Sequence, residues 1–166
     1  MKIGLLSDTH GFLDERIFHH FENCDEIWHA GDIGEESVLE ELRAFKPTQA
    51  VYGNIDSINL QKELPEYTNI EHEGVRTLMI HIGGRPNKYA KGVKELIIQY
   101  KPQLLVCGHN HILKVAMDKN LNTLYMNPGA AGRHGFHQMR TLLRFDLQKG
   151  NIQNLEVIEL GKRAQT

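Results

Sequence analysis

The chain has 166 residues, 40% of them hydrophobic and 24% charged, a composition that fits a folded domain with its own core. It excludes a collagen-like, low-complexity or disordered chain. The 19 Lys and Arg residues are nearly balanced by 21 Asp and Glu, so the net charge is -2 and the chain has no broad positive field for a nucleic-acid backbone. Ten histidines exceed what the packing of such a domain needs, and their positions require an explanation.

Cysteine usage and the amino terminus point to a compartment. Cys24 and Cys107 lie far apart and form no C-x-x-C pair, which argues against a disulfide framework. The apolar stretch 3–6 is too short for the core of a signal peptide, and no stretch approaches the ~20 apolar residues that a membrane span needs. We therefore expect a protein of the reducing cytoplasm with no membrane partner.

Five short apolar runs each end in glycine or polar residues, as buried strands do when they end at a loop. They cover residues 3–6, 27–30, 50–52, 78–80 and 104–107. Apolar residues at helical spacing predict helices over 14–21, 35–45 and 91–100. After residue 112 the pattern predicts strands over 113–117, 121–126, 141–147 and 152–158, with hairpin turns at 119–120 and 149–151. Strands that alternate with return elements predict an α/β fold, and we expect residues 1–166 to form a single domain of two packed sheets.

The polar residues that follow these runs are of metal-ligand types. In open α/β sheets, ligands bind outside the carboxyl ends of the strands. The strand ends offer two carboxylates, one amide oxygen and four imidazoles: Asp8, His10, Asp32, Asn54, His81, His109 and His111. Nitrogen and oxygen donors without thiolate favour Mn, Fe, Zn, Co or Ni over an all-oxygen calcium cage. Seven donors are too many for one tetrahedral zinc, so the pattern predicts two adjacent metal ions that share a ligand.

The charge of such a centre favours an anionic substrate. Two divalent ions outweigh the two carboxylates, Asp8 and Asp32, and the imidazoles and the amide are neutral. Metal ions roughly 3.5–4 Å apart lower the pKa of a bridging water from about 15.7 towards about 7, and they hold the attacking and leaving oxygens of an in-line phosphoryl displacement. The pattern therefore predicts metal-assisted hydrolysis of a phosphoester.

Taken in order, these motifs resemble those of the calcineurin-like metallophosphoesterases, and specifically the small phosphodiesterases of the YfcE kind. The motifs are Asp8-Thr9-His10, Gly31-Asp32, Gly53-Asn54, His81 and Gly108-His109-Asn110-His111, and the resemblance spans residues 3 to about 130. It implies a four-layer α/β/β/α sandwich of two mixed sheets. It also implies two metal sites that share Asp32: one with Asp8, His10 and His111, the other with Asn54, His81 and His109.

The activity that the resemblance implies is hydrolysis of a small phosphodiester by a hydroxide that two metal ions activate. Asn54 and His109 would orient the phosphate, and we expect Mn²⁺, with Fe, Zn, Ni or Co as alternatives. Larger family members carry a histidine after the asparagine as general acid, whereas Asn54 is followed by Ile55 and Asp56, which predicts weak monoesterase activity. His81 is followed by Ile82 instead of glycine, so this loop is expected to take a different course.

Three further residues are candidates for contacting the substrate phosphate: Arg85, Arg133 and His134, with a surface position as the alternative for each. The role of Asp56 is open between a helix cap and an acid beside the metal ligands. Among the other histidines, His29 is expected to pack or to orient a neighbouring ligand, and His137 lies in a glycine-rich loop whose place relative to the site is open.

Other functions stay open. A eukaryotic retromer subunit, the Vps29 type, has this fold and works through protein contacts, so a non-catalytic protein-binding scaffold is the main alternative. That branch has lost part of the ligand set, notably the position matching His10, which is present here. A phosphomonoesterase or a nuclease of the same fold is a further alternative, although a nuclease needs a basic groove that the near-neutral charge does not supply. Assembly into a homo-oligomer is also left open.

Overall fold

The computed structural model describes residues 1–163 and contains two five-stranded mixed sheets. The first sheet has the strand order β12-β11-β1-β2-β3. Its strands are β1 (Lys2–Leu6), β2 (Glu26–His29), β3 (Thr48–Ala50), β11 (Met139–Gln148) and β12 (Asn151–Lys162). Strands β1, β2 and β3 run parallel to one another, while β11 is antiparallel to β1 and pairs with β12 in a long hairpin.

The second sheet has the strand order β4-β5-β8-β10-β9. Its strands are β4 (Tyr67–His72), β5 (Val75–Ile80), β8 (Leu104–Val106), β9 (Leu113–Asp118) and β10 (Thr123–Pro128). Strands β5, β8 and β10 are parallel, and β4 and β9 form antiparallel edges. A separate small hairpin pairs β6 (Gly84–Arg85) with β7 (Lys88–Tyr89).

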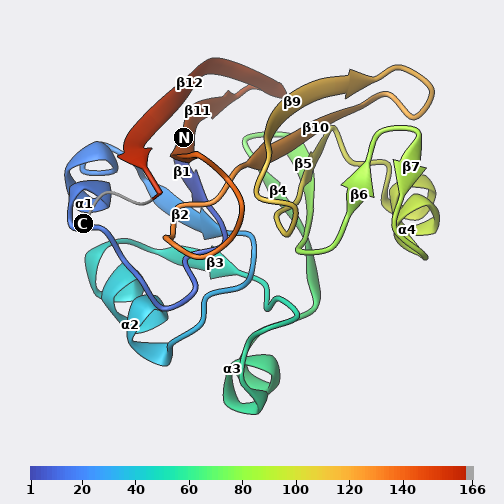
Figure 1. Cartoon of the computed structure of the whole chain (residues 1–166). Helices are drawn as coiled ribbons and strands as arrows, with labels where there is room; N and C mark the ends of the chain where they lie inside the picture. The colour runs from blue at the N-terminus through green and yellow to red at the C-terminus, as the bar shows by residue number, and fades with distance from the viewer. Residues whose placement is uncertain (164–166) are drawn as a thin grey trace.

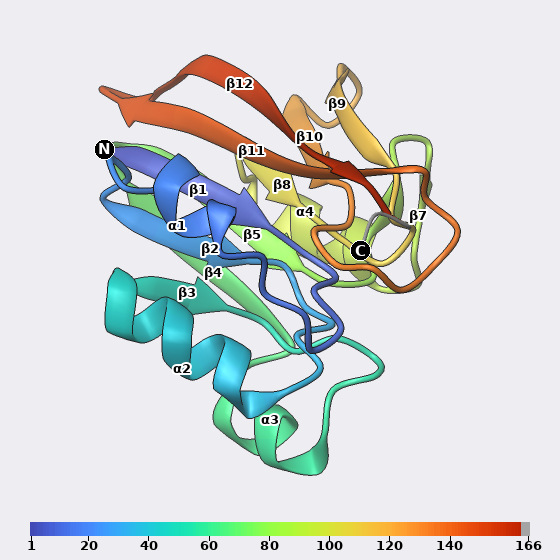
Figure 2. The same cartoon turned by 60° about the vertical axis from the view of Figure 1, so that its left-hand side comes forward.

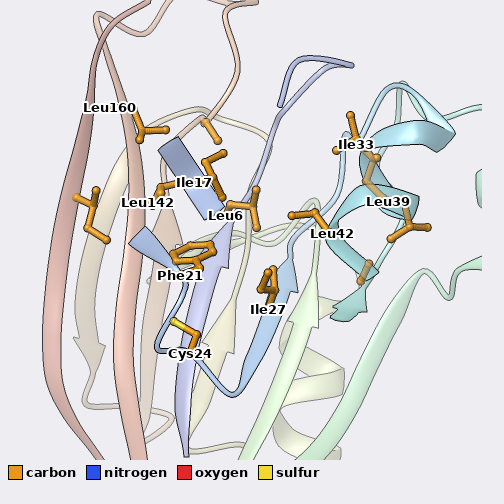
Figure 3. Packing of buried hydrophobic residues seen from close by; sticks show 14 of the residues in the cluster. Leu6, Ile17, Phe21, Cys24, Ile27, Ile33, Leu39, Leu42, Leu142 and Leu160 are labelled. Carbon is orange, nitrogen blue, oxygen red and sulfur yellow. The ribbon is translucent and has the colours of Figure 1, made fainter. Parts of the chain in front are cut away.

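Helices lie on the outside of the two sheets, and all but α3 cover a sheet face, as Figures 1 and 2 show. They are α1 (Arg16–His20), α2 (Glu36–Phe45), α3 (Ile58–Glu63) and α4 (Val93–Tyr100). The outer face of the first sheet contributes Leu6 and Ile27 to a core shared with Ile17 of α1 and Leu42 of α2 (Figure 3). Because side chains alternate along a strand, neighbouring residues of β1 and β2 point to the opposite face.

The space between the two sheets holds the second core. Ile3, Leu5 and Trp28 of the first sheet belong to one buried cluster with Met79 and Val106 of the second sheet. A third core lies on the other face of the second sheet, where α4 contributes Val93 and Ile97 and the strands contribute Leu78, Leu105 and Tyr125. Three cores between four layers confirm the predicted α/β/β/α sandwich of two mixed sheets.

The predicted elements differ from the structure where local pattern is weak. The helix expected over 14–21 is shorter, because α1 covers only Arg16–His20. The strand expected over 50–52 ends earlier, since β3 covers Thr48–Ala50. The sequence pattern did not predict α3, which has one buried residue, or β4, none of whose side chains is fully buried. Elements with few buried residues carry little of the apolar periodicity on which prediction depends.

Both hairpin turns predicted after residue 112 are present, and the tighter one has the backbone that its sequence favours. Lys149 and Gly150 link β11 to β12 with φ values of 49° and 77°, as the twist of a two-residue hairpin loop requires. Cys24 and Cys107 are buried free thiols, as expected. Within residues 1–163, no helix has the length and apolar character needed to cross a membrane.

Candidate metal centre

Loops that follow the parallel strands of both sheets bring the predicted ligands together. Two groups of acidic and histidine side chains have ligand atoms within 4.8 Å of one another: Asp8, His10 and His111 in the first, and Asp32, His81 and His109 in the second. These are the two groups that the resemblance implied, except that Asp32 appears only in the second group and Asn54 in neither. Residues up to 103 positions apart in the chain thus meet at one edge of the sandwich.

Asp32 lies between the two groups. Its Oδ1 atom is 3.2 Å from Nε2 of His81, and its Oδ2 atom is 3.5 Å from Nε2 of His10. The Oδ1 atom of Asn54 is 3.1 Å from the same Nε2 of His81. All seven predicted side chains therefore surround one small volume, and Asp32 is the one that faces both halves of it.

Buried polar atoms without partners indicate what this volume accepts. Oδ2 of Asp8 accepts hydrogen bonds from Oγ of Ser7 at 2.6 Å and from the backbone N–H of His109 at 3.1 Å. In contrast, Oδ1 of Asp8 and Nε2 of His10 are buried and have no hydrogen-bond partner within residues 1–163. A buried polar atom left unpaired destabilises the fold by about 1–3 kcal/mol. A bound cation would satisfy both atoms, so the residues present fit a metal centre.

In two of the imidazoles, Nδ1 makes a hydrogen bond to the protein, which leaves Nε2 available to bind a metal ion. Nδ1 of His81 donates to the carbonyl oxygen of Ala30 at 2.7 Å, so in the neutral ring Nε2 carries no proton and can bind a metal ion. Nε2 of His137 donates to the carbonyl oxygen of Gly132 at 2.9 Å, so its Nδ1 accepts from Nδ1 of His111 at 3.2 Å. His111 is then left with an unprotonated Nε2, 3.1 Å from Oδ1 of Asp8.

The two carboxylates are ionised at neutral pH. Burial opposes the charge of Asp8, but in the metal-free protein the imidazoles of His10 and His111, when protonated, outweigh it and hold the pKa of Asp8 below its ordinary value. Burial also acts against the charge of Asp32, and in the metal-free protein the hydrogen bond from the protonated ring of His81 outweighs it, so the pKa of Asp32 is lowered as well. The same contact, acting against burial, raises the pKa of His81. Two buried carboxylates of like charge at one place are what a cation stabilises.

The backbone at the centre is strained. Five of the candidate ligands adopt the left-handed conformation, with φ values of 55° for Asp8, 47° for His10, 54° for Asp32, 73° for His109 and 59° for His111. Residues other than glycine adopt this conformation infrequently, and it clusters at functional sites. In this conformation the ligand atoms of all five side chains lie in the two groups of the centre.

The glycines that precede two ligands make room for ligands of neighbouring loops. A Cβ atom on Gly53 would lie 2.1 Å from Oδ1 of Asp32, and one on Gly108 would lie 2.1 Å from Oγ of Ser7 and 2.9 Å from Oδ2 of Asp8. Non-bonded atoms do not approach one another this closely. The glycine before each ligand is therefore required by close packing between the loops of the centre.

Two residues that sequence left without a firm role hold the ligand-bearing loops. His29 is fully buried, and its ring contacts the backbone N–H of Gly31 at 3.2 Å and Oγ1 of Thr9 at 2.9 Å, which ties the loops after β1 and β2 together. Asp56 accepts backbone hydrogen bonds from Gly34 and Gly53, each at 2.8 Å. Asp56 therefore holds backbone and does not cap α3, a position that Ser57 occupies.

The three predicted phosphate-contacting residues lie in different surroundings. His134 lines the same cavity as His10 and His111, and its ring centroid is 4.9 Å from that of His10. Arg85 lines a neighbouring cavity that also contains His109. The guanidinium of Arg133 stacks on the ring of Phe12, with its Cζ atom 3.8 Å from the ring centroid. His134 and Arg85 thus adjoin the centre, while Arg133 is engaged with an aromatic ring.

His137, which contacts His111, is the main residue beside the ligands to which the sequence pattern assigned no role. A second histidine three residues after His134, in a loop with three glycines, was the available signal. Its alignment with His111 depends on the fold of that loop, which a local pattern does not specify.

Comparison with known proteins places the chain in a family. Residues 1–150 match the model of the calcineurin-like phosphoesterase superfamily domain. The chain belongs to this superfamily. Membership implies divalent metal binding, in agreement with the donor set described above, and it confirms the resemblance on which the sequence reading relied.

Two archaeal relatives in the superfamily are similar in sequence. A probable metallophosphoesterase of Methanocaldococcus jannaschii is 31% identical over 136 residues, which cover 78% of this chain and 68% of the relative. A second, from Methanothermobacter thermautotrophicus, is 31% identical over 116 residues, 67% of each chain. The chain is thus a metallophosphoesterase by family.

Solved structures share the fold. An archaeal phosphodiesterase superposes with a TM-score of 0.78 at 23% identity, over 96% of this chain and 100% of that one. Vps29 from Entamoeba histolytica, crystallised as a single mutant, superposes with a TM-score of 0.75 at 14% identity, over 97% and 100%. Wild-type Vps29 from the same organism, in complex with Zn²⁺, gives a TM-score of 0.70 at 14% identity, over 96% and 99%. At these identities the likeness establishes the fold and leaves activity open.

Proposed function

We propose that the protein is a phosphodiesterase of this superfamily that uses two divalent metal ions, with Mn²⁺ as the expected ion, and that it acts on a small phosphodiester in the cytoplasm. The observation that carries the proposal is the position of Asp32, whose two oxygens face His81 and His10 in separate ligand groups. Two metal ions that share a carboxylate ligand would account for that position.

Two metal ions bound at this centre would polarise the phosphoryl oxygens and make water nucleophilic at neutral pH. The chain's own residues then orient the substrate. Oδ1 of Asn54 faces His81, so the amide Nδ2 is free to donate to a phosphoryl oxygen. Asn54 and His109 are exposed, whereas Asp8 and Asp32 are buried, so these two ligands form the side of the centre that substrate approaches.

The leaving group decides which esters react. The position after Asn54 is Ile55, and both oxygens of Asp56 accept backbone hydrogen bonds, so neither donates a proton to substrate. His134 and His137 are imidazoles beside the centre that belong to neither ligand group, and both ring nitrogens of His137 are engaged with His111 and Gly132. Esters whose leaving group needs little protonation are therefore the expected substrates, which favours activated diesters over monoesters of poor leaving groups.

The test is turnover of bis(4-nitrophenyl) phosphate by purified protein with added Mn²⁺. We expect Asp32→Asn to reduce kcat by at least about 100-fold, because it weakens both metal sites together. Asp25→Asn is the matched control, because Asp25 is an exposed aspartate just before β2, while Asp32 lies in the loop that follows the same strand. Equal turnover by wild type and Asp32→Asn would refute the proposal.

A protein-binding scaffold is the second candidate, and the superposition with Vps29 favours it. Because one Vps29 structure is a complex with Zn²⁺, metal binding alone does not separate the two functions. Turnover does. Stoichiometric metal binding without hydrolysis of any phosphodiester or monoester would favour the scaffold.

A further inference from the structure

A second cavity adjoins the candidate metal centre on the side of Asn54 and His81. Its volume is about 370 Å³, within the range of sites that bind small molecules. The wall is formed mainly by apolar side chains from the loop after β3, the end of β5 and the segment that leads into α4: Tyr52, Ile80, Ile82, Ala90 and Val93. The cavity shares Asn54 with the cavity that contains His10, Asp32, His109 and His111, so a phosphate at the centre lies next to this apolar space.

Exposed apolar side chains surround the same centre. Ile55, Ile82, Ile112 and Phe136 are 46%, 41%, 61% and 103% exposed, although each is large and apolar. Ile82 lines the apolar cavity, and the other three line the cavity of the ligands. Solvent-exposed apolar side chains clustered around a polar centre are typical of a surface that binds a ligand or a partner.

The charge around the apolar cavity is balanced. Glu66 and Lys91 are its two ionised side chains, both exposed and of opposite sign. A polynucleotide needs a row of cations along its backbone, and this cavity does not supply one. An uncharged organic group is the chemistry that fits such a wall.

We propose that this apolar cavity binds one ester substituent of the substrate, and that the substrate class is small phosphodiesters with an aromatic or branched aliphatic substituent. The inference rests on the proposed function, since it needs a phosphodiester at the centre. Ile82 then has a role: it replaces the glycine expected after His81 and supplies an apolar wall beside the reacting phosphate.

The first test compares two diesters with the same leaving group, methyl 4-nitrophenyl phosphate and phenyl 4-nitrophenyl phosphate. We expect kcat/KM of the wild type to favour the phenyl ester by at least about tenfold, as apolar pockets do for groups that differ by several carbon atoms. Ile82→Ser should lower this ratio several-fold. Comparing the two ratios cancels the intrinsic reactivity of the esters.

Ile98→Ser is the matched control, because Ile98 is a 55% exposed isoleucine on α4 that lines a different cavity, away from the ligands. It should leave the ratio as in the wild type. An unchanged ratio in Ile82→Ser, or a larger kcat/KM for a single-stranded oligonucleotide than for both diesters, would overturn the inference.

The second test needs no turnover. Calorimetry on the Mn²⁺-loaded protein compares phenylphosphonate with methylphosphonate, and we expect phenylphosphonate to bind at least about tenfold more tightly in the wild type and to lose that advantage in Ile82→Ser. If no diester is hydrolysed and the binding preference is present, the proposed function fails and the apolar site stands. If diesters are hydrolysed and the two phosphonates bind equally, the apolar site fails and the proposed function stands.

Discussion

From the contact between His137 and His111 we predict how much a substitution of His137 changes the affinity for metal ions. His137 accepts the proton of His111 Nδ1 at 3.2 Å and is itself fixed by Gly132, so the free Nε2 of His111 is held toward Asp8. His137→Phe keeps a ring of similar size but removes the acceptor. His111 is then free to carry its proton on Nε2 and to rotate. Removing such a partner weakens metal binding by about 10- to 100-fold, or about 1.4–2.7 kcal/mol.

The assay is calorimetric titration of metal-free protein with Mn²⁺, read beside the thermal unfolding of the same samples. His137→Gln retains an acceptor and should recover part of the affinity, which a purely structural role of the side chain would not predict. His19→Phe is the control, because His19 is an exposed histidine on α1. Affinity in His137→Phe equal to that of the wild type, at unchanged Tm, would refute the assigned role.

Burial lowers the pKa of His29 from 6.5 to about 4, so the unfolded chain takes up this proton before the folded protein does. The unfolding free energy of the metal-free protein should therefore keep its full His29 contribution above pH 6.5 and fall by about 3 kcal/mol as the pH is lowered to 4. In His29→Gln the unfolding free energy should vary less over this window, and an equally steep decline would contradict the assignment. Asp14→Ala removes the partner, at 2.8 Å, of the 1% exposed Arg140, and should lower the unfolding free energy in urea by about 3–5 kcal/mol, against less than about 0.5 kcal/mol for Glu40→Ala on the exposed face of α2. His109→Gly relieves a backbone φ of 73° and should raise stability by about 1 kcal/mol while it abolishes the proposed phosphodiesterase activity; a destabilised variant would show that the loop is unstrained.

The main strands and helices were predictable because each has a strong local signal, whereas the order of the four layers was implied by the resemblance to a known family. Strand runs such as Leu104–Val106 are short and wholly buried, and α2 carries Val38, Leu39 and Leu42 on one face. The small elements were not predictable for the opposite reason. Strand β6 has two residues, neither of them buried, so its pairing depends on a partner that the sequence does not indicate.

The candidate ligands could be predicted because, in an α/β fold, binding residues gather at the carboxyl ends of the strands. Side chains at the carboxyl ends of parallel strands meet at one edge, so Asp8, Asp32 and His109 could be grouped from their positions alone. The supporting contacts were not predictable. The hydrogen bonds of His137 and of Asp56 depend on the course of loops, and a loop's course is decided by tertiary packing that leaves no periodic pattern in sequence.

The backbone of the centre shows how much of the fold serves these side chains. Left-handed conformations at Asp8, His10, Asp32, His109 and His111 destabilise the fold by about 1–2 kcal/mol each relative to glycine, together comparable to the whole net stability of a typical domain. A chain that had only to fold would place glycine or asparagine at such positions. Three cores between four layers supply enough stability to hold five strained residues in place. Because the strain lies at the candidate ligands and aims them at one volume, the loops are shaped by what that volume binds, and the rest of the sandwich is the support that makes this shape tolerable.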